Sequence, residues 1–172
     1  MKLITRSNIY LAIMAMILTA ALAVPAAAQK QVPFKGSMHG NDTDTGFTST
    51  TISVLTVGGG NCTHLGQFTF TLENTVDITN GTDSGVAHFI AANGDTIDAT
   101  FVGSGEPTVT PDGVVINITE IFTIVGGTGR FAGAEGFFVM ERVASPVTFL
   151  TSGSFQGSIT SPGRDHAEAD ED

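Results

Sequence analysis

The chain has 172 residues, 41% of them hydrophobic, and carries seven Lys and Arg against 17 Asp and Glu, a net charge of −10. That length fits one domain with a sizeable core. The negative balance argues against binding to nucleic acid or to anionic membrane surfaces. The single cysteine, Cys62, excludes an intramolecular disulfide.

The first 28 residues have the organisation of a bacterial export signal. Lys2 and Arg6 form a basic start, residues 9–24 are an uncharged and largely apolar run, and residues 26–28 are three alanines suited to cleavage. The run is shorter than a membrane span of about 20 residues, although an uncleaved anchor remains the alternative. We therefore expect a secreted or periplasmic protein that begins at Gln29 and does not insert into a membrane after cleavage.

Residues 29–163 are predicted to form a single β-domain. Apolar and polar residues alternate in several segments, most clearly from Phe68 to Leu72, and no segment has the apolar stripe of a helix. Clusters rich in glycine and asparagine predict tight turns. The expected turns are Gly58–Asn61, Asn80-Gly81, Asn93-Gly94, Pro111–Gly113 and Gly126–Gly129. The expected strands are 33–39, 46–57, 64–73, 75–80, 84–92, 95–103, 114–125, 136–143 and 147–160.

Strands of this length and even spacing are typical of an antiparallel barrel or a β-sandwich. Closure into a barrel removes the free edges at which such a Gly-, Thr- and Val-rich chain would pair with other chains. We therefore predict an eight-stranded antiparallel β-barrel, with a β-sandwich as the second choice. Residues 164–172 are acidic and have no apolar anchor, so they are expected to form a disordered tail.

Three segments carry a resemblance to a known group of proteins. They are Thr63-His64-Leu65-Gly66-x-Phe68, Ala91-Ala-Asn-Gly-Asp95, and the stretch from Ile118-Thr-Glu120 to Gly126-Gly-Thr-Gly-Arg-Phe-Ala-Gly-Ala-Glu-Gly136. The chain resembles exported bacterial proteins related to the allene oxide cyclase and dirigent barrels. The resemblance covers most of residues 33–163 and implies an eight-stranded barrel with a central cavity. Plant members of the wider group cyclise an epoxide or steer phenoxy-radical coupling, but the motifs transfer none of their pocket residues to this chain.

Glu120 is the main candidate for a polar group inside the barrel. It shares one face of an alternating strand with Ile118 and Phe122, which points its carboxylate inward. A buried carboxylate must be hydrogen-bonded, paired with a cation or protonated, and Arg142 and Arg130 are the candidate partners. The residues expected to line an apolar ligand pocket, or else to form a structural network, are Glu120, Phe122, Phe70, Phe68, His64 and Arg142.

Other motifs are assigned no chemistry. Gly127–Ala132 matches G-x-G-x-x-A, but an alternating strand follows it in place of the helix that a dinucleotide site requires. Asn41–Gly46 is out of step with a calcium loop, and a polar hairpin loop is expected there. Cys62 has only His64 nearby and is expected to be a passive thiol. The four histidines are scattered, so neither a metal nor a cofactor is expected.

The direction of His88 depends on the hairpin around Asn93-Gly94. A two-residue turn would point it inward with Ile97, whereas a three-residue loop with Gly94 as a bulge would point it outward beside Asp98. The outward arrangement is preferred because it forms a cross-strand His–Asp pair.

These observations favour a non-catalytic exported barrel that binds a small apolar ligand or acts as a structural or interaction module. A cyclase- or isomerase-like enzyme is the alternative, because a cavity with one or two polar groups is sufficient for such rearrangements. A secreted hydrolase inhibitor acting through its loops is a third, weaker possibility. The ligand, the oligomeric state and the physiological role are not specified by the sequence.

Overall fold

The computed structural model describes residues 30–160 and 162–163. The expected export signal and the acidic residues 164–172 lie outside these ranges. Within them, no helix is long and apolar enough to cross a membrane.

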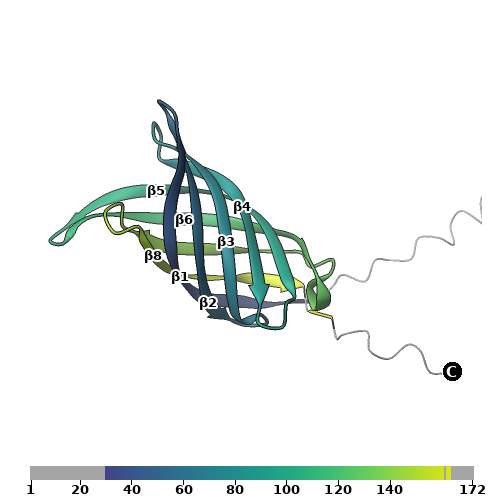
Figure 1. The fold of residues 1–172 in the computed structure, drawn as a ribbon. Helices are drawn as coiled ribbons and strands as arrows, with labels where there is room; N and C mark the ends of the chain where they lie inside the picture. The colour runs from purple at the N-terminus through teal and green to yellow at the C-terminus, as the bar shows by residue number, and fades with distance from the viewer. Residues whose placement is uncertain (1–29, 161, 164–172) are drawn as a thin grey trace, which may run out of the picture.

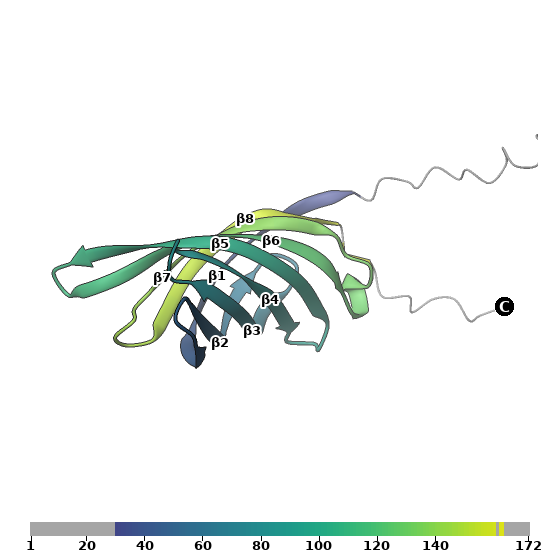
Figure 2. The same cartoon turned by 90° about the horizontal axis from the view of Figure 1, so that it is seen from above.

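The strands form one closed barrel in which every strand pairs antiparallel with its chain neighbours and the last pairs with the first (Figures 1 and 2). The predicted eight-stranded antiparallel barrel is therefore confirmed, and the β-sandwich is wrong. The strands are β1 (Gln31–Phe47), β2 (Thr51–Cys62), β3 (Gly66–Asp77), β4 (Thr82–Ala91), β5 (Thr96–Thr110), β6 (Gly113–Gly127), β7 (Gly136–Ala144) and β8 (Leu150–Thr160).

The two ends of the barrel differ. We call the end with the β1–β2, β3–β4, β5–β6 and β7–β8 connections the open end, and the other the closed end. The β1–β2 hairpin (dark blue, top) and the β5–β6 hairpin (left) extend beyond the barrel in different directions at the open end (Figure 1). At the closed end, a short 3-10 helix, η1 (Gly129–Phe131), brings Phe131 to a fully buried position, and Leu65 is nearly as buried.

The predicted turn at Gly58–Asn61 is wrong, because these residues lie within β2. Gly58 and Gly60 point inward, where a Cβ would lie 2.9 Å from Phe70 Cε1 and 2.6 Å from Phe68 Cζ. The glycines therefore make room for aromatic rings on β3, and the chain does not reverse there.

Several strand boundaries also differ from the prediction. Residues 64–73 and 75–80 are not two strands, since β3 runs through both and the chain turns after Asp77. Asn41–Gly46 is not a hairpin loop, because it continues β1. The reversal follows at Thr48, whose hydroxyl accepts hydrogen bonds from the backbone N–H groups of Thr50 and Thr51. Long antiparallel pairing has outweighed the polar composition of these segments.

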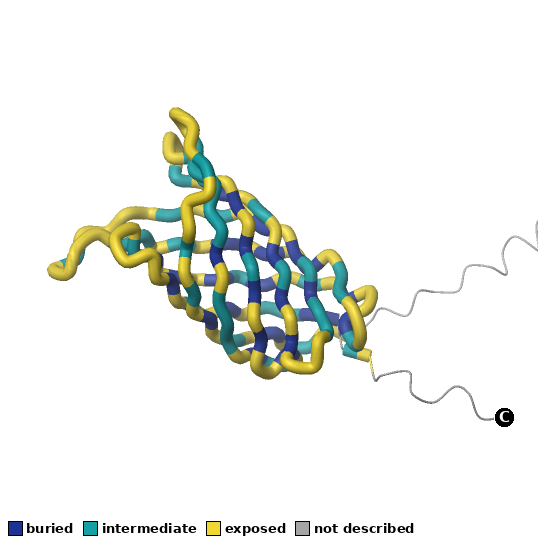
Figure 3. The backbone as a smooth tube through the Cα atoms, in the orientation of Figure 1, coloured by how far each residue is buried: buried dark blue, intermediate teal, exposed yellow. Residues whose placement is uncertain are grey.

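Phenylalanine dominates the core in the middle of the barrel, where buried and exposed residues alternate along each strand (Figure 3). Phe122 stacks on Phe138 with ring centroids 4.6 Å apart and an interplanar angle of 9°. Phe101 stacks on the other side of Phe122 at the same centroid distance. This filled core extends from the closed end to the middle of the barrel, so any space for a ligand must lie nearer the open end.

The β4–β5 hairpin adopts the three-residue loop that was preferred. Phe89 lies opposite Ile97 and His88 opposite Asp98, and His88 Nδ1 lies 2.6 Å from Asp98 Oδ1 on the outer wall. The outward direction of His88 is confirmed. In the turn between β6 and β7, η1 has three residues and is followed by β7. Gly127–Ala132 therefore does not open the long helix that a dinucleotide site needs.

Candidate functional site

Glu120 and Arg142 form a buried ion pair above the aromatic core. Glu120 on β6 lies opposite Met140 and Arg142 on β7 opposite Ile118, so the two are diagonal neighbours on the inner face. Arg142 Nε donates to Glu120 Oε2 at 3.0 Å and Nη2 donates to Oε1 at 2.8 Å. Glu120 has no exposed surface. The inward direction predicted for Glu120 is thus present, and of its two candidate partners Arg142 is the one that pairs with it.

The third guanidinium nitrogen of Arg142 also has partners. Nη1 donates to Thr151 Oγ1 at 3.3 Å and lies 3.8 Å from Asp42 Oδ2. Asp42 in turn accepts a hydrogen bond of 2.6 Å from Thr56. Burial lowers the pKa of Arg142, but the hydrogen bonds and charge of Glu120 outweigh this effect and raise it above the ordinary value. Arg142 is therefore a permanent cation whose charge is already compensated within the protein.

Asp83 and Asn74 extend this polar layer across the barrel. Asn74 Nδ2 donates to Asp83 Oδ2 at 3.2 Å, whereas Asn74 Oδ1 and Asp83 Oδ1 are buried and have no hydrogen-bond partner in the described part of the chain. Burial, followed by the charge of Glu120 and a hydrogen bond between the protonated Asp83 carboxyl and Glu120, raises the pKa of Asp83 to about 7. The Asp83 carboxyl is thus close to half protonated near neutral pH.

A glycine brings the two carboxyl groups of this layer together. Gly103 on β5 lies between Asp83 and Glu120 in the sheet register. A Cβ on Gly103 would lie 2.7 Å from Asp83 Oδ1 and 2.6 Å from Glu120 Cγ. Any other residue at this position would force one of the acidic side chains to move.

A cavity of about 420 Å³ opens above the polar layer at the open end of the barrel. Its volume lies within the range of about 300–1,000 Å³ typical of small-molecule sites. Polar side chains form its floor, and the main aliphatic side chains of its wall come from β2, β3 and β6 and from the turn after β3. The floor residues are Asp42, Asn74, Asp83 and Arg142, the exposed Asp44 also lines the cavity, and the main apolar wall residues are Ile52, Val54, Val76, Ile78, Ile116 and Ile118.

The structure separates the six predicted site residues into three groups. Arg142 lines the cavity, and Glu120 lies beneath it as the ion-pair partner. Phe68, Phe70 and Phe122 are buried in the core and do not line the cavity. His64 is exposed in the turn before β3, and its Nε2 lies 3.1 Å from the carbonyl oxygen of Pro33. Its predicted inward direction is wrong because its positive φ of 70° breaks the alternation that begins at Gly66.

The alternative cation, Arg130, lies elsewhere. Its Nε is 3.2 Å from Asp95 Oδ2 at the closed end, far along the strands from Glu120. Asp83 and Asn74 were not among the predicted site residues. Both positions continue an inward alternation, Asn74 after Leu72 and Asp83 before Ala87, so the period-two pattern contained the signal.

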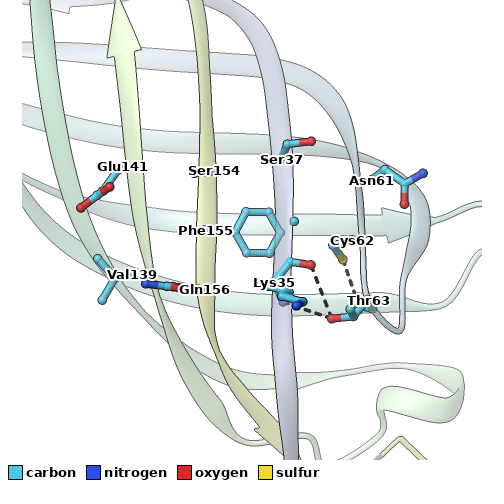
Figure 4. Close-up of a pocket in the computed structure, with 11 residues that line it drawn as sticks. Lys35, Ser37, Asn61, Cys62, Thr63, Val139, Glu141, Ser154, Phe155 and Gln156 are labelled. Atoms are coloured by element: carbon cyan, nitrogen blue, oxygen red, sulfur yellow. Dashed lines mark hydrogen bonds between the residues drawn. The ribbon is translucent and has the colours of Figure 1, made fainter.

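A second hollow, of about 590 Å³, lies on the outer wall over β1, β2, β7 and β8 (Figure 4). Lys35, Glu141 and Gln156 on its rim are exposed. Cys62 at its base donates to the carbonyl oxygen of Thr63 at 3.1 Å, and burial raises the pKa of its thiol to about 11. This hollow offers no buried unpartnered polar atom, so the cavity at the open end is the stronger candidate.

Metal-ligand geometry is not found either: within residues 30–160 and 162–163, no three His, Cys, Asp or Glu side chains converge on a point suited to a metal ion.

Comparison with known proteins supports the architecture. No protein-family model and no curated protein matches the sequence. Among solved structures, the pterocarpan synthase dirigent protein has a similar fold, with a TM-score of 0.53 and 11% sequence identity over 79% of this chain and 88% of that one. The chain therefore has a dirigent-like barrel fold, as the resemblance implied. At this level of identity the similarity concerns the fold alone.

Proposed function

We propose that this protein is an exported barrel that binds a small, largely apolar molecule with one polar end in the cavity at the open end, without changing it chemically. The aliphatic wall would bury the apolar body, and the polar floor would fix the orientation of the other end. The protein would be secreted or periplasmic and would act without nucleic acid, metal or cofactor.

The observation that carries this proposal is the pair of unpartnered acceptors on the cavity floor. Asn74 Oδ1 and Asp83 Oδ1 are both buried and without a partner among the described residues. Leaving a buried polar group unpaired costs about 1–3 kcal/mol. A purely structural layer gains nothing from this cost, whereas a binding site recovers it when a ligand supplies the missing hydrogen bonds.

Extraction of the natural occupant tests the proposal. Protein recovered from an exporting bacterial host is extracted with organic solvent, and the extract is analysed by mass spectrometry. The Val54→Trp variant fills part of the cavity wall and is expected to lose the compound. Val102→Trp is the matched control, because Val102 is exposed on the outer wall. A compound retained equally by both variants would show that binding occurs elsewhere.

A cyclase- or isomerase-like activity is the second candidate, and Asp83 is the observation that favours it. A carboxyl group with a pKa of about 7 beside an apolar cavity has the protonation behaviour of a general acid. The extracted compound is incubated with fresh protein and then analysed by chromatography and fragmentation, since an isomer has unchanged mass. Conversion that Asp83→Asn abolishes would establish the enzyme, and recovery of the unchanged compound would establish the binding protein.

A further inference from the structure

We propose that the polar end of the ligand is a protonated amine. This inference rests on the proposed function, because it assigns the chemical class of the molecule in that cavity. It follows from the charge around the cavity floor and from the free acceptor atoms there.

The charges around the floor do not balance. Asp42, Asp44 and Asp83 line the cavity together with one cation, Arg142. Glu120 beneath the floor holds that cation through two hydrogen bonds. Even with Asp83 protonated, the two other aspartates and Glu120 outnumber Arg142, so the empty site is short of positive charge.

The free hydrogen-bonding groups on the floor are acceptors. Asn74 is 6% exposed and its Oδ1 has no partner among the described residues, whereas Asp83, 9% exposed, has a free Oδ1 only when it is ionised, because its protonated form hydrogen-bonds Glu120. An ammonium group has three donors and no acceptor, so it can satisfy the free oxygen of Asn74 and the carboxylate of the neighbouring Asp83 at the base of an apolar wall. A ligand carboxylate would add negative charge next to the aspartates, and the guanidinium that would otherwise attract it is already held by Glu120.

Binding of an ammonium group should release a proton from Asp83. The groups that face Asp83 are Asn74 on β3, Glu120 on β6 and Arg142 on β7, with Gly103 on β5 between the two carboxyl groups. The added positive charge favours the ionised carboxylate, and the proton leaves to solvent. Amine binding should therefore weaken as pH falls below about 7.

A matched series of indole compounds tests the inference. Tryptamine, tryptophol and indolepropionate share one body and present a cation, a neutral alcohol and an anion. The chain contains no tryptophan, so the indole fluorescence of each probe reports its binding without background. Each probe is titrated against the wild type, Asp83→Asn and Asp98→Asn. Asp98 lies on the outer wall, so Asp98→Asn is a matched control for the loss of one carboxylate.

We expect the wild type and Asp98→Asn to bind tryptamine at least about tenfold more tightly than tryptophol, and indolepropionate most weakly. Asp83→Asn should remove most of that preference. Equal or tighter binding of tryptophol or indolepropionate would overturn the amine assignment and leave the binding function intact. If millimolar Ca²⁺ displaces tryptamine but hexylamine does not, the natural ligand of the floor is a metal ion and the amine assignment is overturned. Failure of all three probes to bind would overturn both proposals.

Discussion

Replacement of Glu120 by glutamine tests the energetic role of the buried ion pair. The wild-type carboxylate accepts two hydrogen bonds from Arg142, at 3.0 and 2.8 Å. An amide retains one acceptor oxygen but turns its NH₂ group towards a guanidinium donor. Arg142 is then left with Thr151 and with Asp42 at 3.8 Å. The substitution thus removes both the partner charge and one hydrogen bond from a fully buried site.

Removing one partner of a buried ion pair typically costs about 3–5 kcal/mol. We expect the lower end, about 3 kcal/mol, because the neighbouring Asp83 can ionise and replace part of the lost charge. At about 2–4 °C per kcal/mol for a domain of this size, the melting temperature should fall by about 6–12 °C. Far-UV circular dichroism during urea and thermal unfolding is the appropriate assay, because Trp is absent and the single tyrosine, Tyr10, precedes the barrel.

Two further variants make the test decisive. Glu141→Gln on the exposed face of β7 should change stability by less than about 0.5 kcal/mol. The double variant Glu120→Met, Arg142→Met should be more stable than Glu120→Gln, because the buried guanidinium is removed together with its partner and Asp42 keeps its hydrogen bond from Thr56. If Glu120→Gln unfolds within about 0.5 kcal/mol of the wild type, the pair does not stabilise the barrel and the reasoning is refuted.

Four other predictions concern separate parts of the chain. Burial raises the folded-state pKa of Asp83 from 3.8 to about 7, so the stability it contributes is full below pH 3.8 and is lost as pH rises through about 7. The unfolding free energy of Asp83→Asn should therefore exceed that of the wild type by about 1–2 kcal/mol at about pH 8.5, after allowance for solvent screening, and by less at about pH 5. An equal difference at both pH values in urea unfolding would contradict this. Phe122→Ala should lose about 3–5 kcal/mol in the same unfolding assay, because its ring is stacked on both sides. Cys62 should resist alkylation at neutral pH until the chain is unfolded, and rapid labelling of the folded protein would show that its thiol is accessible. Intact mass of the exported protein should correspond to a chain that begins at Gln29, whereas a membrane-bound species that retains Met1 would contradict cleavage.

The period-two pattern was sufficient to predict the barrel and the direction of its best-patterned residues. Glu120 and Arg142 lie in strands with uninterrupted alternation, so their inward direction followed from counting. The outward direction of His88 needed one further argument, because it depended on the length of a single loop. These predictions succeeded because they depend on the alternation of residues along one strand and on the length of one loop, both of which can be read from the sequence.

The errors arose where distant parts of the chain decide the outcome. Gly58 and Gly60 resemble turn residues until the rings of Phe70 and Phe68 on the next strand are placed opposite them. His64 has the parity of Phe68 but lies before the strand begins. The cavity was placed too deep because alternation specifies which face a residue occupies and not its height along the barrel. That height depends on the stagger of all eight strands.

The separation of the filled aromatic half from the open half has a consequence for how this barrel can change. The stacked rings that hold the closed half together lie one layer below the cavity. Wall positions such as Ile52, Val76 and Ile116 are only partly buried, so new side chains there alter the shape of the cavity without removing a core contact. Substitutions at the mouth of the cavity should therefore cost little folding stability. A laboratory library confined to these positions should retain a high proportion of folded members. The same scaffold is in this way suited to acquiring new specificities by substitution at its rim.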